Sequence, residues 1–164
     1  MKKVCFITLI VLAAYCLSSC RSNKPVVATP PAPAEGICAV LGFQYGTNVT
    51  AEEAKEITDL FRINFCPSKY RLTDDNRVDN ELAKRGYKNR KMTKQQMCEV
   101  GRDLGARLVV VGTINKLMDE YSVDVQVVDT QKGTTVAFEG DAFQKPESSK
   151  RIQDLAKKLA SKTK

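Results

Sequence analysis

The strongest fold signal in the chain lies in residues 104–138, which read LGARLVVVGTINKLMDEYSVDVQVVDTQKGTTVAF. The most apolar run is 107–117, and its length and β-branched content predict a central buried strand. Apolar and polar side chains alternate over 121–127, which predicts a strand with one solvent-facing side. Turn residues at 129–133 and a third run over 134–143 follow. These residues therefore predict three consecutive strands in a meander.

Helical patterns and shorter strands surround this meander. We expect a buried strand at 37–43 and a short one at 70–73, each bounded by turn residues or proline. Capping boxes and other cap signals predict four helices. The expected caps of the first three helices are Thr50, Asp75 and Thr93, and Pro146 is expected to open the last helix.

Each of these helices carries one apolar face, as the spacing of three and four residues indicates. The predicted inward residues are Ala54, Ile57, Thr58, Phe61 and Phe65, then Val78 and Leu82, then Met97, Val100, Gly101 and Leu104, and last Ile152, Leu155, Ala156 and Leu159. The predicted order is β-α-β-α-α-β-β-β-α, an α/β fold of mixed α+β character. It implies a mixed sheet of about five strands covered by helices.

The N-terminus has the pattern of an exported precursor. It opens with MKK, continues with an apolar run over 4–17 and reaches LSSC at 17–20. The run is too short for a bilayer-spanning helix, which needs about 20 apolar residues, so 1–19 are predicted to be a signal peptide. Small residues before Cys20 resemble the bacterial lipobox, which implies acylation of that thiol. The alternative is an ordinary signal peptide with a cysteine near its cleavage site.

Residues 20–36 are predicted to be the lipidated N-terminus and a Pro-rich flexible spacer. Prolines among small residues cannot build a core, and they extend the chain toward polyproline II. At about 3.1 Å per residue the spacer reaches on the order of 45 Å. Residues 37–164 are then one globular domain. Arg21 is not the acidic residue that sorting rules associate with inner-membrane retention, so we expect an outer-membrane anchor and a periplasmic domain.

Cysteine usage leaves two alternatives for the mature chain. Cleavage would leave Cys20, Cys38, Cys66 and Cys98 of the six cysteines, and acylation of Cys20 would leave an odd number. No C-x-x-C spacing is present. The simplest interpretation is that the three others are small buried side chains, and the alternative is one disulfide among them.

Composition and motifs argue against an enzyme. The chain has no histidine, which removes the usual general base and the commonest metal ligand. It contains no phosphate-binding loop, dinucleotide fingerprint or nucleophile elbow. We therefore predict no catalytic residue, no metal and no cofactor. The carboxylates Asp74, Asp75, Asp79 and Glu81 are interpreted as ordinary helix N-terminal acids.

The chain carries 26 basic and 19 acidic residues, and removal of the two lysines of the signal peptide leaves a net charge near +5. This favours acidic partners such as anionic lipid, wall polymer or an acidic protein face. Nucleic acid is not expected, because export separates the protein from it. The most basic segment, KRGYKNRKMTK (84–94), has no acid. Its candidate partner-binding residues are Lys84, Arg85, Tyr87, Lys88, Arg90 and Lys91, although a solvated loop is the plainer interpretation.

Several stretches together resemble the domain shared by LpoB-like penicillin-binding-protein activators, CsgG-like curli-secretion lipoproteins and the TolB N-terminal domain. The stretches are AVLGF (39–43), LGARLVVVGTINKL (104–117) and YSVDVQVVDTQKGTTVAF (121–138). The resemblance implies a helix-covered mixed sheet, like anticodon-binding domains, on an acylated envelope protein that binds proteins. It covers roughly residues 37–143.

The resemblance implies two functions. The first is an outer-membrane lipoprotein that activates or scaffolds a peptidoglycan synthase, with possible contact to anionic wall polymer. The alternative is an accessory subunit of a curli-like secretion complex. A curli-type pore needs long amphipathic hairpins, and the predicted elements leave none unassigned. The spacer and single domain therefore favour the activator.

Overall fold

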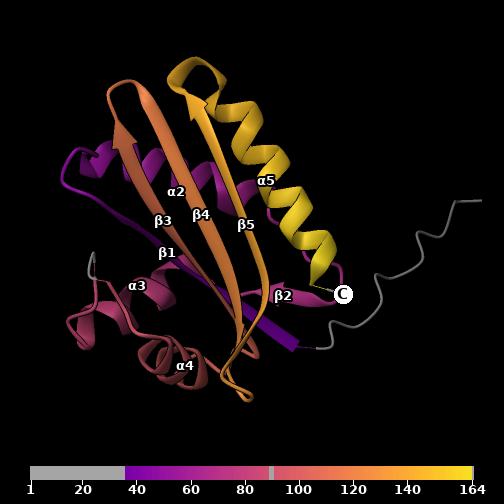
Figure 1. Cartoon of the computed structure of the whole chain (residues 1–164). Coiled ribbons are helices and arrows are strands. Elements are labelled where there is room, and N and C mark those ends of the chain that lie inside the picture. Colours follow the sequence, from indigo (N-terminus) through magenta and orange to yellow (C-terminus); the bar gives the residue numbers. More distant parts are fainter. Residues whose placement is uncertain (1–35, 89–90, 164) are drawn as a thin grey trace, which may run out of the picture. The chain divides into compact units, whose positions relative to one another are not determined.

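A five-stranded mixed sheet organises the computed structural model, which describes residues 36–88 and 91–163 (Figure 1). The strands are β1 (Gly36–Tyr45), β2 (Tyr70–Leu72), β3 (Leu108–Leu117), β4 (Glu120–Asp129) and β5 (Thr134–Gln144). The helices are α2 (Ala51–Asn64), α3 (Asp75–Lys84), α4 (Lys94–Asp103) and α5 (Ser148–Lys162), with a 3-10 helix η2 (Lys145–Glu147) before α5. The predicted order of strands and α-helices is confirmed.

The strands lie in the order β2-β1-β3-β4-β5. Strand β1 runs parallel to both β2 and β3, whereas β3, β4 and β5 form an antiparallel meander. Parallel neighbours require crossover connections, and the helices between β1, β2 and β3 supply them. The most apolar strand, β3, lies in the middle of the sheet, as its sequence predicted.

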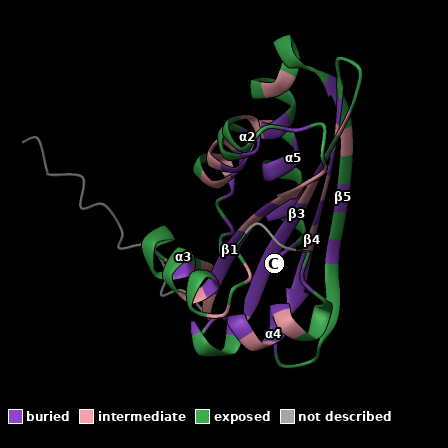
Figure 2. Cartoon of the chain, turned by 90° about the vertical axis from the view of Figure 1, so that its left-hand side faces the viewer, coloured by how far each residue is buried: buried purple, intermediate pink, exposed green. Residues whose placement is uncertain are grey.

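Each face of the sheet is covered by a pair of helices, which Figure 2 shows on either side of the largely buried strands. Helices α2 and α5 pack on one face over the side chains of Cys38, Val40 and Phe43 in β1 and their neighbours in β3, β4 and β5. Helices α3 and α4 pack on the other face over Ala39 and Leu41. Alternation along β1 therefore sends successive side chains into two separate cores.

Helix starts follow the predicted caps, with one correction. Thr50 and Glu53 form a complete capping box, and so do Thr93 and Gln96. Helix α3 is capped by Asp74 rather than by the predicted Asp75, because the Asp74 carboxylate accepts hydrogen bonds from the N–H groups of Asn76 and Arg77. Both residues are acidic, so only the structure shows which one lies outside the helix.

The other boundaries differ from the predictions by small amounts. Helix α4 is followed by Gly105 at φ +68°, the left-handed conformation expected of that glycine. Pro146 lies in η2, and the final α-helix begins two residues later, at Ser148. All the residues predicted to face inward from the helices are buried.

The described residues begin at Gly36, so the predicted signal peptide, Cys20 and the predicted spacer up to residue 35 lie outside them. Arg90 of the basic segment lies outside them as well. Among the helices at 36–88 and 91–163, none combines the length and the apolar character needed to cross a bilayer.

Candidate functional site

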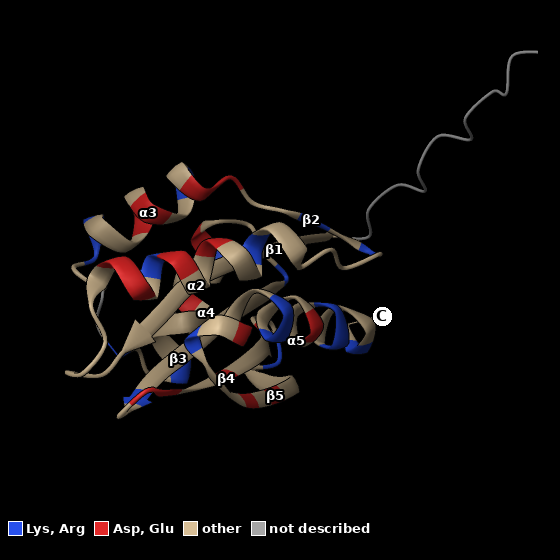
Figure 3. Cartoon of the chain, turned by 90° about the horizontal axis from the view of Figure 1, so that it is seen from above, with Lys and Arg blue, Asp and Glu red and all other residues tan. Residues whose placement is uncertain are grey.

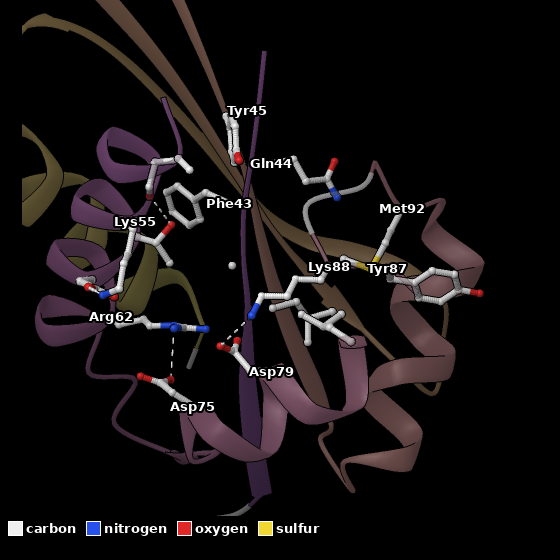
Figure 4. Close-up of a pocket in the computed structure, with 17 residues that line it drawn as sticks. Phe43, Gln44, Tyr45, Lys55, Arg62, Asp75, Asp79, Tyr87, Lys88 and Met92 are labelled. Atoms are coloured by element: carbon white, nitrogen blue, oxygen red, sulfur yellow. Dashed lines mark hydrogen bonds and ion pairs between the residues drawn. The ribbon is translucent and has the colours of Figure 1, made fainter. Parts of the chain in front are cut away.

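A groove of about 390 Å³ lies between α2 and α3, with β1 along its floor (Figure 4). Its volume is in the range of natural small-molecule pockets. The lining residues are Leu41, Gly42, Phe43, Gln44 and Tyr45 from β1, Ala51, Ala54, Lys55, Thr58, Asp59 and Arg62 from α2, and Asp75, Asp79 and Leu82 from α3, with Tyr87, Lys88 and Met92 from the following segment. The α2 residues follow a helical spacing of three and four, so one face of α2 forms the wall.

The floor of this groove is an open edge of the sheet. Strand β2 pairs with β1 only over Gly36–Cys38, and the last bond between backbone groups on this side joins the Thr73 N–H to the Cys38 carbonyl. Within residues 36–88 and 91–163, no strand pairs with the rest of this side of β1. The edge is open because β2 has three residues and β1 has ten.

One backbone carbonyl on this edge accepts a hydrogen bond from a side chain. The guanidinium Nη2 of Arg62 donates to the Val40 carbonyl at 3.0 Å, and its Nε lies 3.3 Å from Oδ1 of Asp75 in α3. The Arg62 side chain is only 14% exposed. Arg62 therefore ends the covered part of the β1 edge and joins α2 to α3.

A β-bulge follows at Gly42. The register of β1 against β3 shifts between Val40 and Phe43. Gly42 has a backbone φ of +90°, a conformation that residues with a Cβ rarely adopt. After the bulge, the Gly46 N–H donates to the Ile114 carbonyl of β3. By strand alternation, the backbone groups of Phe43 and Tyr45 then face away from β3, into the groove.

Beside this open edge lies an unsatisfied side-chain donor. The Nε2 atom of Gln44 is buried, and no hydrogen-bond partner accompanies it within the described residues. Figure 4 shows the Gln44 amide and the Phe43 ring on opposite sides of β1. A buried amide without a partner costs about 1–3 kcal/mol. The groove therefore holds polar groups on the strand and beside it that an acceptor could satisfy.

The predicted basic segment forms part of the same site. Tyr87 and Lys88 line the groove. Met92, further along the segment, also lines it and is buried in the α3/α4 core. Tyr87 is half-buried and packs against that core. Lys91 is exposed.

The structure also neutralises much of the segment's charge, which its acid-free sequence did not suggest. The Arg85 guanidinium binds Glu81, at 2.7 Å, and also contacts Glu99 and Asp103 of α4. The hydrogen bond from Arg85 lowers the pKa of Glu81.

The two neighbouring lysines are paired in the same way. Lys84 lies 3.7 Å from Glu81, and Lys88 lies 3.9 Å from Asp79. Figure 3 shows acidic and basic segments mixed on α2 and α3. The acids that compensate the segment come from α3 and α4, so they could not be found within it.

A second polar cluster lies at the start of α2. Glu53 accepts hydrogen bonds from the Lys116 ammonium at 2.8 Å, from the Tyr121 hydroxyl and from the Thr50 N–H. The bond from Lys116, followed by the one from Thr50, lowers the pKa of Glu53 to about 2. All three donors are satisfied by one carboxylate, so the cluster fixes the start of α2 to β3 and β4.

The residues that carried the family resemblance hold the fold together. The Asp129 carboxylate accepts hydrogen bonds from Arg107 and from the N–H groups of Gln131 and Lys132. The Thr130 hydroxyl contacts the carbonyls of Ala106 and Arg107 at 2.8 and 3.1 Å. These contacts tie the β4–β5 turn to the start of β3, so the motif residues have structural roles.

The three cysteines of the described domain are free thiols, so the disulfide alternative is not found. Cys38 and Cys98 are buried as predicted, whereas Cys66 is exposed after the end of α2. Burial raises the pKa of Cys38 to about 12. No group of three or more His, Cys, Asp or Glu side chains that could hold a metal occurs within 36–88 and 91–163.

The sequence pointed to only one part of the groove, Tyr87 and Lys88 of the basic segment. Arg62, Gly42 and Gln44 were not predicted to belong to a site. A glycine inside an apolar strand is a signal for a bulge, so Gly42 could have been recognised. The small residues Ala51 and Ala54 on one face of α2 give no such signal, because alanine is common in any helix.

No protein-family model matches the chain, and no curated protein sequence matches it. Solved structures do match. The C-terminal domain of LpoB from Salmonella enterica has a TM-score of 0.52 at 16% identity, over 71% of this chain and 88% of that chain. The LpoB C-terminal domain from Escherichia coli has a TM-score of 0.51 at 15% identity, over 73% and 90%.

TolB from Acinetobacter baumannii matches with a TM-score of 0.50 at 14% identity, over 82% of this chain but 28% of that chain. The likeness to TolB therefore concerns a part of TolB. At such low identities, the likeness to these structures establishes the fold. The domain has the fold of the LpoB C-terminal domain, as the sequence resemblance implied.

Proposed function

We propose that the protein is a non-enzymatic lipoprotein of the bacterial outer membrane, anchored through acylated Cys20, whose domain binds an envelope protein in the periplasm. The observation that carries this proposal is the LpoB-type fold, which covers about nine tenths of the solved LpoB C-terminal domains. In this sequence the fold follows a lipobox-like start and a Pro-rich spacer. An anchored tether with a compact domain suits a protein that reaches a partner.

The partner that this arrangement supports best is a peptidoglycan synthase of the penicillin-binding-protein class, which the lipoprotein activates or scaffolds. Both the sequence resemblance and the LpoB fold support it. We assign the contact to the α2–α3 groove and the adjoining basic segment, which includes exposed Lys91 and, outside the described residues, Arg90. An acidic protein face or an anionic wall polymer would complement those two cations.

The anchor is tested by fractionation and mass spectrometry of the protein from its own cells. Acylated Cys20 should be the first residue of the mature chain, and the protein should sediment with the outer membrane. Replacement of Cys20 by serine should release the domain into the soluble periplasmic fraction or leave the signal peptide uncut. An unmodified Cys20 in the wild-type protein would contradict the anchor.

Partner binding is tested by crosslinking the native lipoprotein in its own cells and then by adding the purified protein to the synthase it captures. Faster glycan polymerisation is expected. A variant with Lys88, Arg90 and Lys91 changed to glutamate should bind less well, and the deficit should depend on salt. In the control variant, glutamate replaces Lys132, Lys150 and Lys157, which are exposed elsewhere on the domain.

A measurement of the oligomeric state would distinguish the activator from the alternative, an accessory subunit of a curli-like secretion complex. A monomeric or small assembly in light scattering agrees with the activator. A closed ring of many copies, with no effect on glycan polymerisation, would instead support a secretion complex.

A further inference from the structure

We propose that the α2–α3 groove takes an extended, uncharged segment of the partner protein, which adds to the open edge of β1 as a new strand. This inference rests on the proposed function, because it specifies how the partner docks. It follows from three features of the groove: an unpaired strand edge, walls on both sides of that edge, and charges that are already paired.

The unpaired edge supplies the backbone hydrogen bonds. The N–H and C=O groups of Phe43 and Tyr45 face the groove, and no strand covers them among the described residues. Exposed edges are a ready template for another chain, and proteins usually cover or charge them. Peptide-binding domains use the same geometry, with backbone bonds for affinity and pockets for alternate side chains.

The walls supply pockets for alternate side chains. Ala51, Ala54 and Thr58 form the α2 wall and leave space beside the Phe43 ring. Leu82 and Met92 line the opposite side, where Figure 4 also shows Tyr87. Because the side chains of a strand point alternately to the two faces, an added strand would place them alternately against α2 and against the α3 side.

The charges of the groove indicate an uncharged occupant. Lys55 pairs with Asp59, Arg62 with Asp75, and Lys88 with Asp79. Three cations and three carboxylates of the lining therefore compensate one another. A charged segment that bound here would lose the water around its charge and would find no unpaired counter-charge in the lining. This desolvation would cost binding free energy. Backbone carbonyls or an amide of an uncharged segment could instead accept from Gln44, whose Nε2 has no partner in the described part of the chain.

The probe for this proposal is a phage-displayed library of short linear peptides, selected against the mature protein. Peptides that bind are synthesised, and each backbone amide in turn is methylated on nitrogen. An added strand donates only every second N–H to β1, so methylation should weaken binding about tenfold at alternate positions and little between them. A uniform effect would contradict strand addition.

Blocking variants locate the binding. Ala51→Trp puts a bulky ring into the groove from α2, and Glu52→Trp is its control, since Glu52 is exposed and does not line the groove. Asp79→Trp blocks from α3, with exposed Asn80→Trp as its control. Each blocking variant should weaken peptide binding about tenfold relative to its control, with thermal melting showing that all four are folded. A peptide that adds instead to β5, at the opposite edge of the sheet, would bind the blocking variants and their controls equally well. Equal binding would therefore overturn the assignment to β1.

The outcomes separate this inference from the proposed function. If the library yields no binder, or only charged peptides, strand addition of an uncharged segment is wrong. Full synthase activation by Ala51→Trp would also reject it, together with the assignment of the contact to the groove, but would leave the proposed activation of a synthase in place. If peptides bind with the alternating pattern but the protein captures no synthase in its own cells, the groove is confirmed and the proposed partner is wrong.

Discussion

The two faces of the sheet differ in what covers them. The α2/α5 face holds the larger core, with buried aromatic side chains that contact one another, among them Phe43, Phe61 and Phe65. The α3/α4 face has a smaller core of aliphatic side chains, methionine and cysteine, under two helices of ten residues each. The first face is built for stability. The second carries α3, which forms one wall of the groove.

The largest expected effect is on the aromatic face. Phe61 is fully buried between Phe43 and Phe65, at 5.1 and 5.2 Å between ring centroids. Phe61→Ala should lower the free energy of unfolding by about 3–5 kcal/mol. Met97→Ala, in the other core, should cost about 2 kcal/mol, because methionine fills its site more adaptably. Urea unfolding followed by circular dichroism measures both, and equal losses would contradict the comparison.

A smaller effect is expected where β1 contacts β3. A Cβ on Gly112 would lie 2.5 Å from the Phe43 ring, which cannot move freely because Phe61 lies behind it. Gly112→Ala should therefore destabilise the domain by about 1–3 kcal/mol. Gly46→Ala is the control, since its nearest atom would be 3.4 Å away. A Gly112→Ala protein as stable as the control would show that the aromatic face tolerates movement.

The stability of the domain should depend on pH through Glu53, which lies at the start of α2 on the aromatic face. Its pKa is lowered from 4.5 to about 2, chiefly by the hydrogen bond from Lys116, so its contribution is complete above pH 4.5 and disappears as the pH falls toward 2. Glu53→Gln should reduce the loss of stability across that window. Melting temperatures of both proteins at a series of pH values measure it, and parallel curves would contradict the role of Glu53.

The smallest perturbation is thiol labelling, which compares the two cores without mutation. Cys66 is exposed and should react with iodoacetamide at once, whereas Cys38 and Cys98 are buried on opposite faces. Cys98 should react before Cys38, because the smaller α3/α4 core opens more easily. Mass spectrometry after protease digestion follows each site. Earlier labelling of Cys38 would reverse the proposed order of stability.

Much of the fold could be predicted because its signals are local. The capping boxes at Thr50 and Thr93 and the glycine at 105 fix helix ends within a few residues of chain, and the alternation over 121–127 fixes which face of β4 is buried. The candidate site could be predicted only in part. Tyr87 and Lys88 were found from the composition of their segment, but the ion pair of Lys88 with Asp79 and the place of both residues beside β1 were not.

The sequence by itself determined the order of elements and the apolar faces, since each depends on neighbours along the chain. The lipobox and its spacer stay predictions from the sequence. The tertiary structure alone decided that β2 covers only three residues of β1, that Arg62 closes the edge at Val40, and that acids of α3 and α4 neutralise the basic segment. Strand pairing and ion pairs join residues distant in sequence, and the free energy that selects them comes from packing of the whole domain.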